Sequence, residues 1–329
     1  MRDIAIDLGT ASTRVWAKGR GIVLDEPTVV ALHQRGGEVR AMGHEAHELI
    51  ARGSGSFVAR RPLVGGAVTD FDATASLLRM VLCRLRVRRP SRLRLVVCIP
   101  SGLTEIERRA LEQAAAQAGV GATYPISEPL AAAMGAGLAI DQPIGTMVVD
   151  AGGGSCKVAM ISLGEIVTCA LVRSGGFDID DAIARHVRSR FDLAIGAREA
   201  EQVKVEIGSA SPQLPEPRVE VSGREVAGGL PRTVTLAGDA IRAVIDPCVS
   251  AIVGAVLDVL GSCPPALAQD VVDTGMWLCG GGAKLRGLAT HLAAETGLPV
   301  HLADRPAEAV IRGAGQVVEQ LDDWKHLSV

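Results

Sequence analysis

Residues 4–15 read IAIDLGTASTRV, and residues 147–158, 143 positions later, read MVVDAGGGSCKV. The Asp, the first Gly, the Ser and the Val coincide, and Arg14 falls on Lys157. Each copy has the pattern of a buried apolar strand, an acidic residue at its end, a tight turn of small residues and a second strand. Because self-similarity at a fixed offset marks an internal duplication, the sequence predicts two related half-structures that face each other.

The residue types in the two turns suit phosphate binding. Small residues allow backbone N–H groups to approach phosphate oxygens closely, so two opposed turns would clamp a polyphosphate. Asp7 and Asp150 at the strand ends are suited to hold a hydrated Mg²⁺, which keeps several of its waters. Arg14 and Lys157 would add positive charge, unless side-chain alternation along the strand turns them towards solvent. One Asp-x-Gly alone is more often an ordinary turn, but the matched pair favours a nucleotide site.

Three further segments extend this interpretation. Gly280–Gly282 follows an apolar strand and precedes a helix-like run, which is either a ligand-binding turn of bare backbone or a plain strand-to-helix turn. Glu201 and Lys204 share one face of a charged helix over 199–206, a spacing that is usually only a solvated ion pair. Glu128 stands where a strand gives way to a helix. Its carboxylate is either a favourable charge at the helix N-terminus or a group that orients an attacking water.

Length and composition limit the possible classes of protein. The 329 residues suit about two domains of ~150 residues each. A hydrophobic fraction of 48% excludes disorder, and a net charge of −3 argues against a nucleic-acid partner. The seven scattered Cys without a Cys-x-x-Cys pair suit a reducing cytoplasm. No signal-peptide layout and no apolar run near the ~18 residues of a membrane span are recognised, so we expect a soluble or peripheral protein.

Together these segments resemble the actin and chaperone-ATPase superfamily, and most closely the MreB family of bacterial actins. The resemblance rests on residues 4–11, 21–27, 126–129, 150–154, 204–209 and 280–282. It implies an α/β, actin-like fold, a duplicated ribonuclease H-like architecture of two domains and four subdomains around a nucleotide cleft. The first domain would comprise 1–144 plus 313–329, with a small subdomain at about 30–70. The second would comprise 145–312, with a small subdomain at about 181–238.

The resemblance also assigns residues to ATP and Mg²⁺. The first phosphate turn matches Asp7, Gly9, Thr10, Ala11 and Ser12, and the second matches Asp150, Gly152, Gly153 and Gly154. Glu201 and Lys204 match the nucleoside-side helix, and the adenosine turn matches Gly280, Gly281, Gly282 and Ala283. Glu128 matches the carboxylate that polarises the hydrolytic water. Electrostatic stabilisation would then carry most of the catalysis, as phosphoryl transfer generally requires.

The sequence departs from the family pattern at several positions. The usual second turn reads DIGGGTTE, whereas residues 150–157 read DAGGGSCK. Ser155 keeps one hydroxyl, Cys156 replaces the other, and Lys157 replaces an acid. Arg14 stands where the family mostly has an apolar residue, and Ser127 replaces the first acid of Glu-Glu-Pro. Our hypothesis is that Arg14 and Lys157 tighten nucleotide binding, while the altered residues near the water leave hydrolysis slow.

The implied function is a filament at the inner face of the cell membrane that organises cell-wall synthesis and cell shape. Self-association, cell-wall elongation membrane proteins as partners and a weak ATPase coupled to assembly belong to that implication. The six arginines within Arg84 to Arg94 predict peripheral membrane contact, unless they are only a solvated loop. The alternatives are a small-molecule kinase or a non-polymerising ATPase of the same superfamily, and a peptide-binding chaperone, which would need a further substrate domain.

Overall fold

Each repeated segment forms the centre of a five-stranded sheet in the computed structural model, which describes residues 2–52, 55–212 and 216–322. The first sheet consists of β1 (Asp3–Leu8), β2 (Ser12–Ala17), β3 (Gly21–Pro27), β9 (Arg94–Ile99) and β10 (Ala122–Ser127). The second consists of β11 (Thr146–Ala151), β12 (Cys156–Ser162), β13 (Glu165–Val172), β17 (Met276–Cys279) and β18 (Val300–Leu302).

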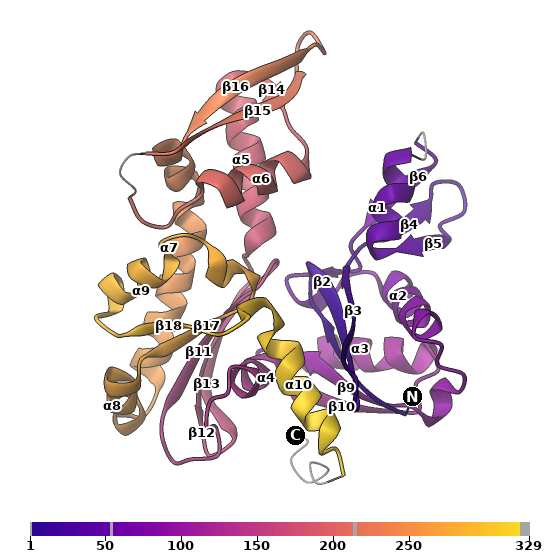
Figure 1. Ribbon diagram of the computed structural model, residues 1–329, viewed down its shortest axis with the longest axis vertical. Helices are drawn as coiled ribbons and strands as arrows, with labels where there is room; N and C mark the ends of the chain where they lie inside the picture. Colours follow the sequence, from indigo (N-terminus) through magenta and orange to yellow (C-terminus); the bar gives the residue numbers. More distant parts are fainter. Residues whose placement is uncertain (1, 53–54, 213–215, 323–329) are drawn as a thin grey trace.

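The two sheets have the same topology. Their orders are β10-β9-β1-β2-β3 and β18-β17-β11-β12-β13. In each sheet the first repeated strand pairs antiparallel with the next strand and parallel with one that comes later in the chain. The duplication predicted from the sequence is therefore confirmed, and the two halves lie side by side (Figure 1).

Helices cover both faces of each sheet. The helices of the first half are α2 (Phe71–Arg84), α3 (Glu105–Gln117) and α4 (Glu128–Gly135), and those of the second are α5 (Gly176–Phe191), α7 (Gly238–Ser262), α8 (Pro265–Thr274) and α9 (Leu288–Thr296). The last described helix is α10 (Ala309–Glu319). Every residue of β1 is buried because Ile4 and Ile6 share a core with α2 and α3, while Ala5 shares one with α4 and α10.

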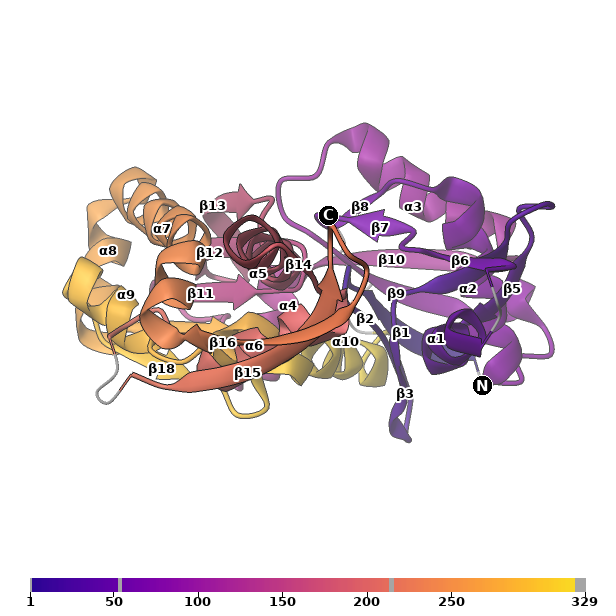
Figure 2. The same ribbon diagram turned by 90° about the horizontal axis from the view of Figure 1, so that it is seen from above.

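Helices α4 and α10 join the halves. Ala5 of the first sheet and Val148 of the second belong to one hydrophobic cluster together with residues of both helices. Figure 2 shows the pair between the two sheets when the molecule is seen from above. The helices cross in backbone contact, because a Cβ on Gly135 would lie 1.8 Å from Ala309 O, and one on Gly313 would lie 1.8 Å from Ala131 O.

Smaller units stand above each half in Figure 1. Above the first sheet are β4 (Val30–His33), β5 (Val39–Met42), α1 (Gly43–Arg52) and β6 (Phe57–Arg60), followed by the hairpin β7 (Leu63–Val64) and β8 (Ala67–Val68). Above the second are β14 (Leu193–Ala194), α6 (Ala197–Ile207), β15 (Arg218–Glu225) and β16 (Pro231–Ala237). Short 3₁₀ turns are η1 (Pro90–Arg92), η2 (Gly281–Lys284) and η3 (Pro306–Glu308).

The prediction that no apolar run approaches the length of a membrane span does not hold for helix α7. Helix α7 has 25 residues and is, by length and composition alone, long and apolar enough to cross a membrane. Its Ile241, Ile245, Val249 and Val256 nevertheless lie in the core of the second half, against β12 and β13. A core helix of a soluble domain passes the same test of length and composition, so this finding is weak support for a span.

Candidate functional site

The two repeated turns close in the same way. Gly9 N donates a hydrogen bond to Ser12 O at 3.1 Å, and Gly152 N donates one to Ser155 O at 2.9 Å. Each turn follows a central strand of its sheet, so the duplication of the sequence becomes a duplication of turn geometry. Backbone N–H groups in such tight turns are the donors that bind phosphate oxygens.

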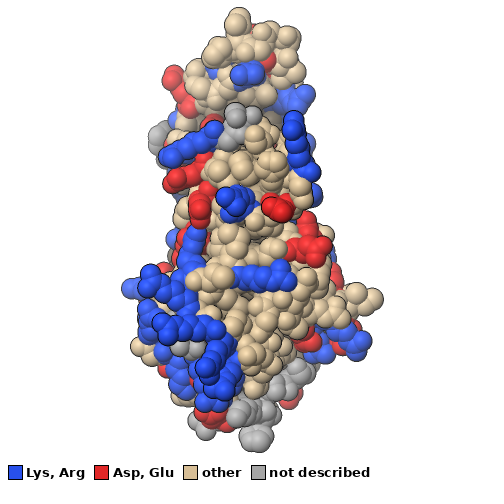
Figure 3. Space-filling model, turned by 90° about the vertical axis from the view of Figure 1, so that its right-hand side faces the viewer, with Lys and Arg blue, Asp and Glu red and all other residues tan. Residues whose placement is uncertain are grey.

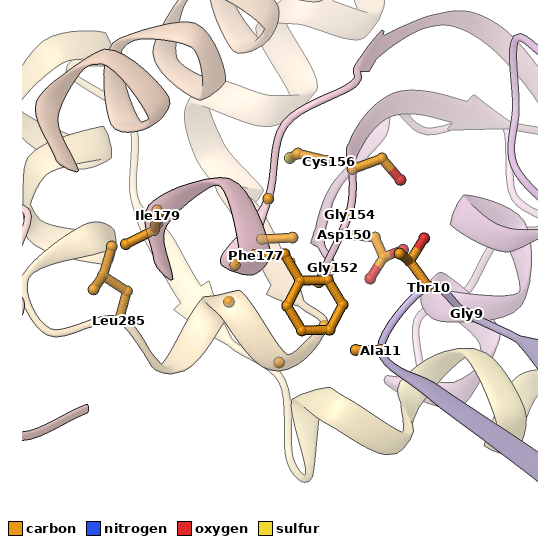
Figure 4. A pocket seen from close by; sticks show the side chains of 18 of the residues that line it. Gly9, Thr10, Ala11, Asp150, Gly152, Gly154, Cys156, Phe177, Ile179 and Leu285 are labelled. Carbon is orange, nitrogen blue, oxygen red and sulfur yellow. The ribbon is translucent and has the colours of Figure 1, made fainter. Parts of the chain in front are cut away.

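The turns meet across the cleft between the halves. A Cβ on Gly153 would lie 2.5 Å from Ala11 Cβ, and one on Gly154 would lie 2.6 Å from Thr10 Oγ1. Figure 4 shows Thr10 and Ala11 opposite Gly152 and Gly154. Glycines are needed at 153 and 154 because the first turn occupies the space that a side chain would fill.

A cavity of about 460 Å³ opens at this meeting point, within the range of ligand pockets. Almost all predicted residues line it, namely Asp7, Gly9, Thr10, Ala11, Ser12, Arg14, Glu128, Asp150, Gly152, Gly153, Gly154, Ser155, Lys157, Glu201, Lys204, Gly280, Gly281 and Gly282. Ala283 is the exception, since its side chain packs into the core of the second half and the neighbouring Lys284 lines the cavity instead. Our assignment of Ala283 to the cavity is therefore corrected.

Lys157 lies among three buried carboxylates. Its Nζ is 2.6 Å from Glu128 Oε2 and 3.4 Å from Asp150 Oδ2. Lys157 is directly opposite Asp150 in the β11–β12 ladder, so both side chains leave the same face of the sheet. Asp7, Glu128, Asp150 and Lys157 are each less than a tenth exposed. The side chain therefore points into the cleft and not to solvent.

The burial and the close approach of these charges shift the pKa values of Asp7, Glu128 and Lys157. Desolvation, reinforced by the Glu128 carboxylate, raises the pKa of Asp7 to about 7. Desolvation also raises the pKa of Glu128, although Lys157 opposes the rise. Burial alone would lower the pKa of Lys157, but Glu128 and Asp150 outweigh it and hold that pKa well above its ordinary value. The cluster is thus a place where additional positive charge is stabilising.

Within the described ranges, Arg14, the counterpart of Lys157 in the first repeat, does not contact the buried carboxylates through an ion pair. It is directly opposite Asp7 in the β1–β2 ladder and lines the cavity. Its guanidinium, however, donates to Ala307 O at 2.7 Å and lies 3.1 Å from Asp25 Oδ1. Arg14 is therefore held by protein groups at the edge of the cleft.

The far end of the cavity is mostly apolar. Its lining includes Ile179, Val249, Ile252, Leu285 and Leu288. Figure 4 shows Ile179 and Leu285 close together at this end, away from the two turns. Such a surface suits the flat face of an aromatic base.

Helix α6 supplies the predicted charged pair, but the partners differ. Lys204 Nζ lies 2.8 Å from Asp180 Oδ1 and donates to Gly176 O at 3.1 Å. The alternative, a solvated ion pair between Glu201 and Lys204, is not found among the described residues, because α5 places Asp180 beside the ammonium.

Sequence reasoning missed a further glycine turn that lines the cavity. Gly175 and Gly176 open α5 and line the cavity, and a Cβ on Gly175 would lie 2.7 Å from Gly152 O. Gly176 N and Phe177 N donate to Gly152 O and Gly153 O. A Gly-Gly pair directly before an amphipathic helix was the signal that could have found it.

The predicted adenosine turn at Gly280–Gly282 is followed by a 3₁₀ turn and not directly by an α-helix. Gly280 has φ +81°, and a Cβ there would lie 2.2 Å from Ala151 O, so only glycine fits. The residues after it form the 3₁₀ turn η2, and α9 begins only at Leu288. The expected helix start at Ala283 is thus a single tight turn. The bare backbone at Gly281 and Gly282 still faces the cavity.

The residues present fit a nucleotide with its cation. Two opposed turns offer N–H donors, and Asp7 and Asp150 offer the carboxylate oxygens that Mg²⁺ takes as ligands. Over residues 2–52, 55–212 and 216–322, no group of three or more His, Cys, Asp or Glu side chains is arranged to hold a metal ion. A divalent ion here would share its coordination with phosphate oxygens and water.

Comparison with known proteins identifies the family. A sequence model described as MreB/Mbl protein matches residues 1–326. The chain belongs to the MreB/Mbl family. Within this family, the cell shape-determining protein MreB of Escherichia coli K12 is 44% identical over 327 residues, covering 97% of this chain and 94% of that protein. The cell shape-determining protein Mbl of Bacillus subtilis 168 is 39% identical over 322 residues, covering 98% and 97%.

A solved structure supports the same assignment. MreB5 of Spiroplasma citri bound to ADP matches this MreB/Mbl chain with a TM-score of 0.91 at 32% identity, covering 100% of this chain and 99% of that one. The same protein was also solved with AMPPNP. The fold of the present chain is therefore actin-like.

Proposed function

We propose that this chain binds ATP with Mg²⁺ in the cleft and assembles into cytoskeletal filaments at the cytoplasmic face of the cell membrane, where they organise cell-wall synthesis and cell shape. The observation that carries the proposal is the contact of Thr10 and Ala11 with Gly153 and Gly154 across the cleft, beside buried carboxylates. The ADP and AMPPNP complexes of the S. citri relative support the ligand. The names of the E. coli and B. subtilis relatives support the cellular role.

The polar and apolar ends of the cavity would bind different parts of the nucleotide. The N–H groups of the two turns would bind the phosphates, and the apolar end at Ile179, Ile252 and Leu285 would take the base. Asp7 and Asp150 would hold Mg²⁺ through water molecules of its hydration shell. When bound, this ion neutralises phosphate charge. Closure of the two halves around the phosphates would make the angle between them depend on the nucleotide.

Glu128 is the candidate group for orienting the attacking water. It is the first residue of α4 and lines the cavity, 4% exposed. In the described structure its carboxylate is engaged by Lys157 at 2.6 Å. A carboxylate held by an ammonium is a weaker acceptor for a water proton, so we propose that hydrolysis is slow and coupled to assembly.

Membrane contact is proposed for four arginines that we call the basic loop: Arg86, Arg88, Arg89 and Arg92. All four are exposed between α2 and β9, and no ion pair of theirs is found in the part of the chain that the structure describes. Figure 3 shows Lys and Arg side chains gathered on the lower half of one face of the molecule. The other two predicted arginines are engaged, Arg84 with Glu26 and Glu45, and Arg94 with Asp3 and Asp322.

ATP-dependent pelleting combined with electron microscopy tests the proposal. We expect filaments with ATP and Mg²⁺, and more of them on anionic vesicles. A chain that binds ATP but forms no filaments in either condition would contradict the assembly and favour the kinase or a non-polymerising ATPase. Membrane proteins of cell-wall elongation remain the proposed partners of the filament.

A further inference from the structure

Three buried carboxylates and one buried ammonium occupy the phosphate end of the cavity. Lys157 Nζ lies 2.6 Å from Glu128 and 3.4 Å from Asp150, and it is 3.6 Å from the place where a Cβ on Gly152 would stand. The ammonium is therefore directly beside the second phosphate turn. Its residue is only 6% exposed, so solvent screens its charge weakly.

The other cations that line the cavity are bound by groups outside this cluster of carboxylates or lie in another turn. Arg14 is held by Ala307 O and Asp25, and Lys204 by Asp180 and Gly176 O. Lys284 belongs to the η2 turn. Among the described residues, Lys157 is thus the only cation in ion-pair contact with the carboxylates of the cluster.

The charges of the cluster oppose a polyphosphate. Ionised Asp7, Glu128 and Asp150 would repel phosphate oxygens strongly, because charges in a desolvated cleft interact through a low effective dielectric. A divalent ion is the usual means of offsetting such repulsion, but it must be captured from solution. A lysine ammonium is fixed by the chain and offsets part of the same charge at all times.

We propose that Lys157 is a resident cation of the phosphate site, so that nucleotide binding by this chain depends on Mg²⁺ far less than in the same chain without that ammonium. This inference rests on the proposed function, namely that the cleft binds ATP. It goes further because it assigns part of the charge neutralisation to the chain itself. The ammonium also forms ion pairs with the carboxylates of Glu128 and Asp150. A divalent ion would therefore coordinate those carboxylate oxygens less closely.

The test measures ATP and ADP affinity by titration calorimetry, with Mg²⁺ and again with EDTA. For the unaltered chain we expect removal of Mg²⁺ to weaken ATP binding by less than about 10-fold, and for Lys157→Met by more than about 100-fold. The matched control is Lys18→Met, an exposed lysine outside the cavity, which should behave like the unaltered chain. Equal Mg²⁺ dependence of the unaltered chain and Lys157→Met would overturn the inference.

Two further measurements keep the test decisive if Lys157→Met folds poorly. The unaltered chain is informative alone, because a loss of more than about 100-fold in EDTA would overturn the inference. Lys157→Arg keeps the charge and should keep the weak dependence on Mg²⁺, whereas a dependence like that of Lys157→Met would contradict the role of charge.

Mg²⁺ without nucleotide gives an independent readout. It should raise the melting temperature of Lys157→Met, whose carboxylates have lost their ammonium, and leave the unaltered chain nearly unchanged. The opposite pattern would count against the inference. Failure of the proposed function looks different, since the unaltered chain would then bind no nucleotide even with Mg²⁺ present.

Discussion

Gly135 of α4 and Gly313 of α10 lie in backbone contact, and a Cβ on Gly313 would be 2.9 Å from Gly135 N. The helix pair connects the cores of the two halves, so this contact lies where the halves are joined. Because both residues are glycine, the helix axes approach more closely than side chains would allow.

Gly313→Ala is expected to destabilise the chain. The added methyl would meet Ala131 O at 1.8 Å, and overpacking of this kind costs about 1–3 kcal/mol. Urea denaturation measures the change in the free energy of unfolding. Gly254→Ala is the control, since a Cβ on this glycine of α7 would meet no atom within 4 Å outside its own stretch of helix, and alanine there should be neutral or stabilising. Equal effects of the two substitutions would contradict the close crossing.

Gly154→Ala should weaken nucleotide binding strongly while leaving the sheets intact. Its Cβ would meet Thr10 at 2.6 Å, so the two turns would be pushed apart. We expect a loss of ATP affinity of about 10-fold or more, equivalent to ~1.4 kcal/mol. Calorimetric titration measures it, with Gly254→Ala again as the control. Unchanged affinity would show that the turns need not touch for binding.

Lys157→Gln should raise ATP turnover if the ammonium restrains Glu128. The amide removes the charge at 2.6 Å from Glu128 and leaves a shorter polar side chain. Turnover is followed by phosphate release at saturating Mg-ATP, and an increase of about 10-fold is expected, within the range of general-base effects. The companion Glu128→Gln should lower turnover in both backgrounds. If Lys157→Gln is no faster, the pairing does not limit hydrolysis.

Replacing the four arginines of the basic loop by glutamine should reduce co-sedimentation with anionic liposomes. Each cation near an anionic surface contributes on the order of 1 kcal/mol, and salt weakens the effect. The control replaces Arg185, Arg188, Arg190 and Arg198, which are exposed on the second half, and so changes the net charge equally. Binding that is insensitive to anionic lipid content, or lost equally in both variants, would contradict the proposed membrane face.

Asp3 and Arg94 provide a test of pH dependence. Arg94 donates to both carboxylate oxygens of Asp3 at 2.7 Å, and these hydrogen bonds hold the pKa of Asp3 below its ordinary 3.8. A depressed pKa contributes stability above about pH 4 that is lost as the pH falls through the folded-state value. Asp3→Asn should therefore cost about 1.5–3 kcal/mol at pH 7.

The difference between the unaltered chain and Asp3→Asn should narrow as the pH falls below about 4 towards the lower folded-state pKa of Asp3, because protonation removes the charge that Arg94 binds. Urea denaturation between pH 7 and pH 3 measures this trend. Asp141→Asn, at an exposed loop position, is the control and should show little change at any pH. A constant difference across the range would contradict the ionic origin of the stabilisation.

The sequence by itself determined the duplicated strand-turn-strand units and the junction at Glu128. These features depend on neighbours a few positions away, through side-chain alternation, tight-turn residues and helix caps. Helix α4 begins at Glu128 as expected. The resemblance to the MreB family also came from the sequence, because a family pattern of short motifs in a fixed order survives wide divergence elsewhere.

Only the tertiary structure decided which charges meet. Lys157 faces Glu128, which is 29 positions earlier on another element, and Lys204 binds Asp180 of α5 and not Glu201 of its own helix. Likewise, Gly175 and Gly176 join the cavity, while Ala283 turns into the core. Spacing along the chain cannot settle such choices, because an ion pair forms with whichever group the packing of distant elements brings within a few ångströms in a desolvated cleft.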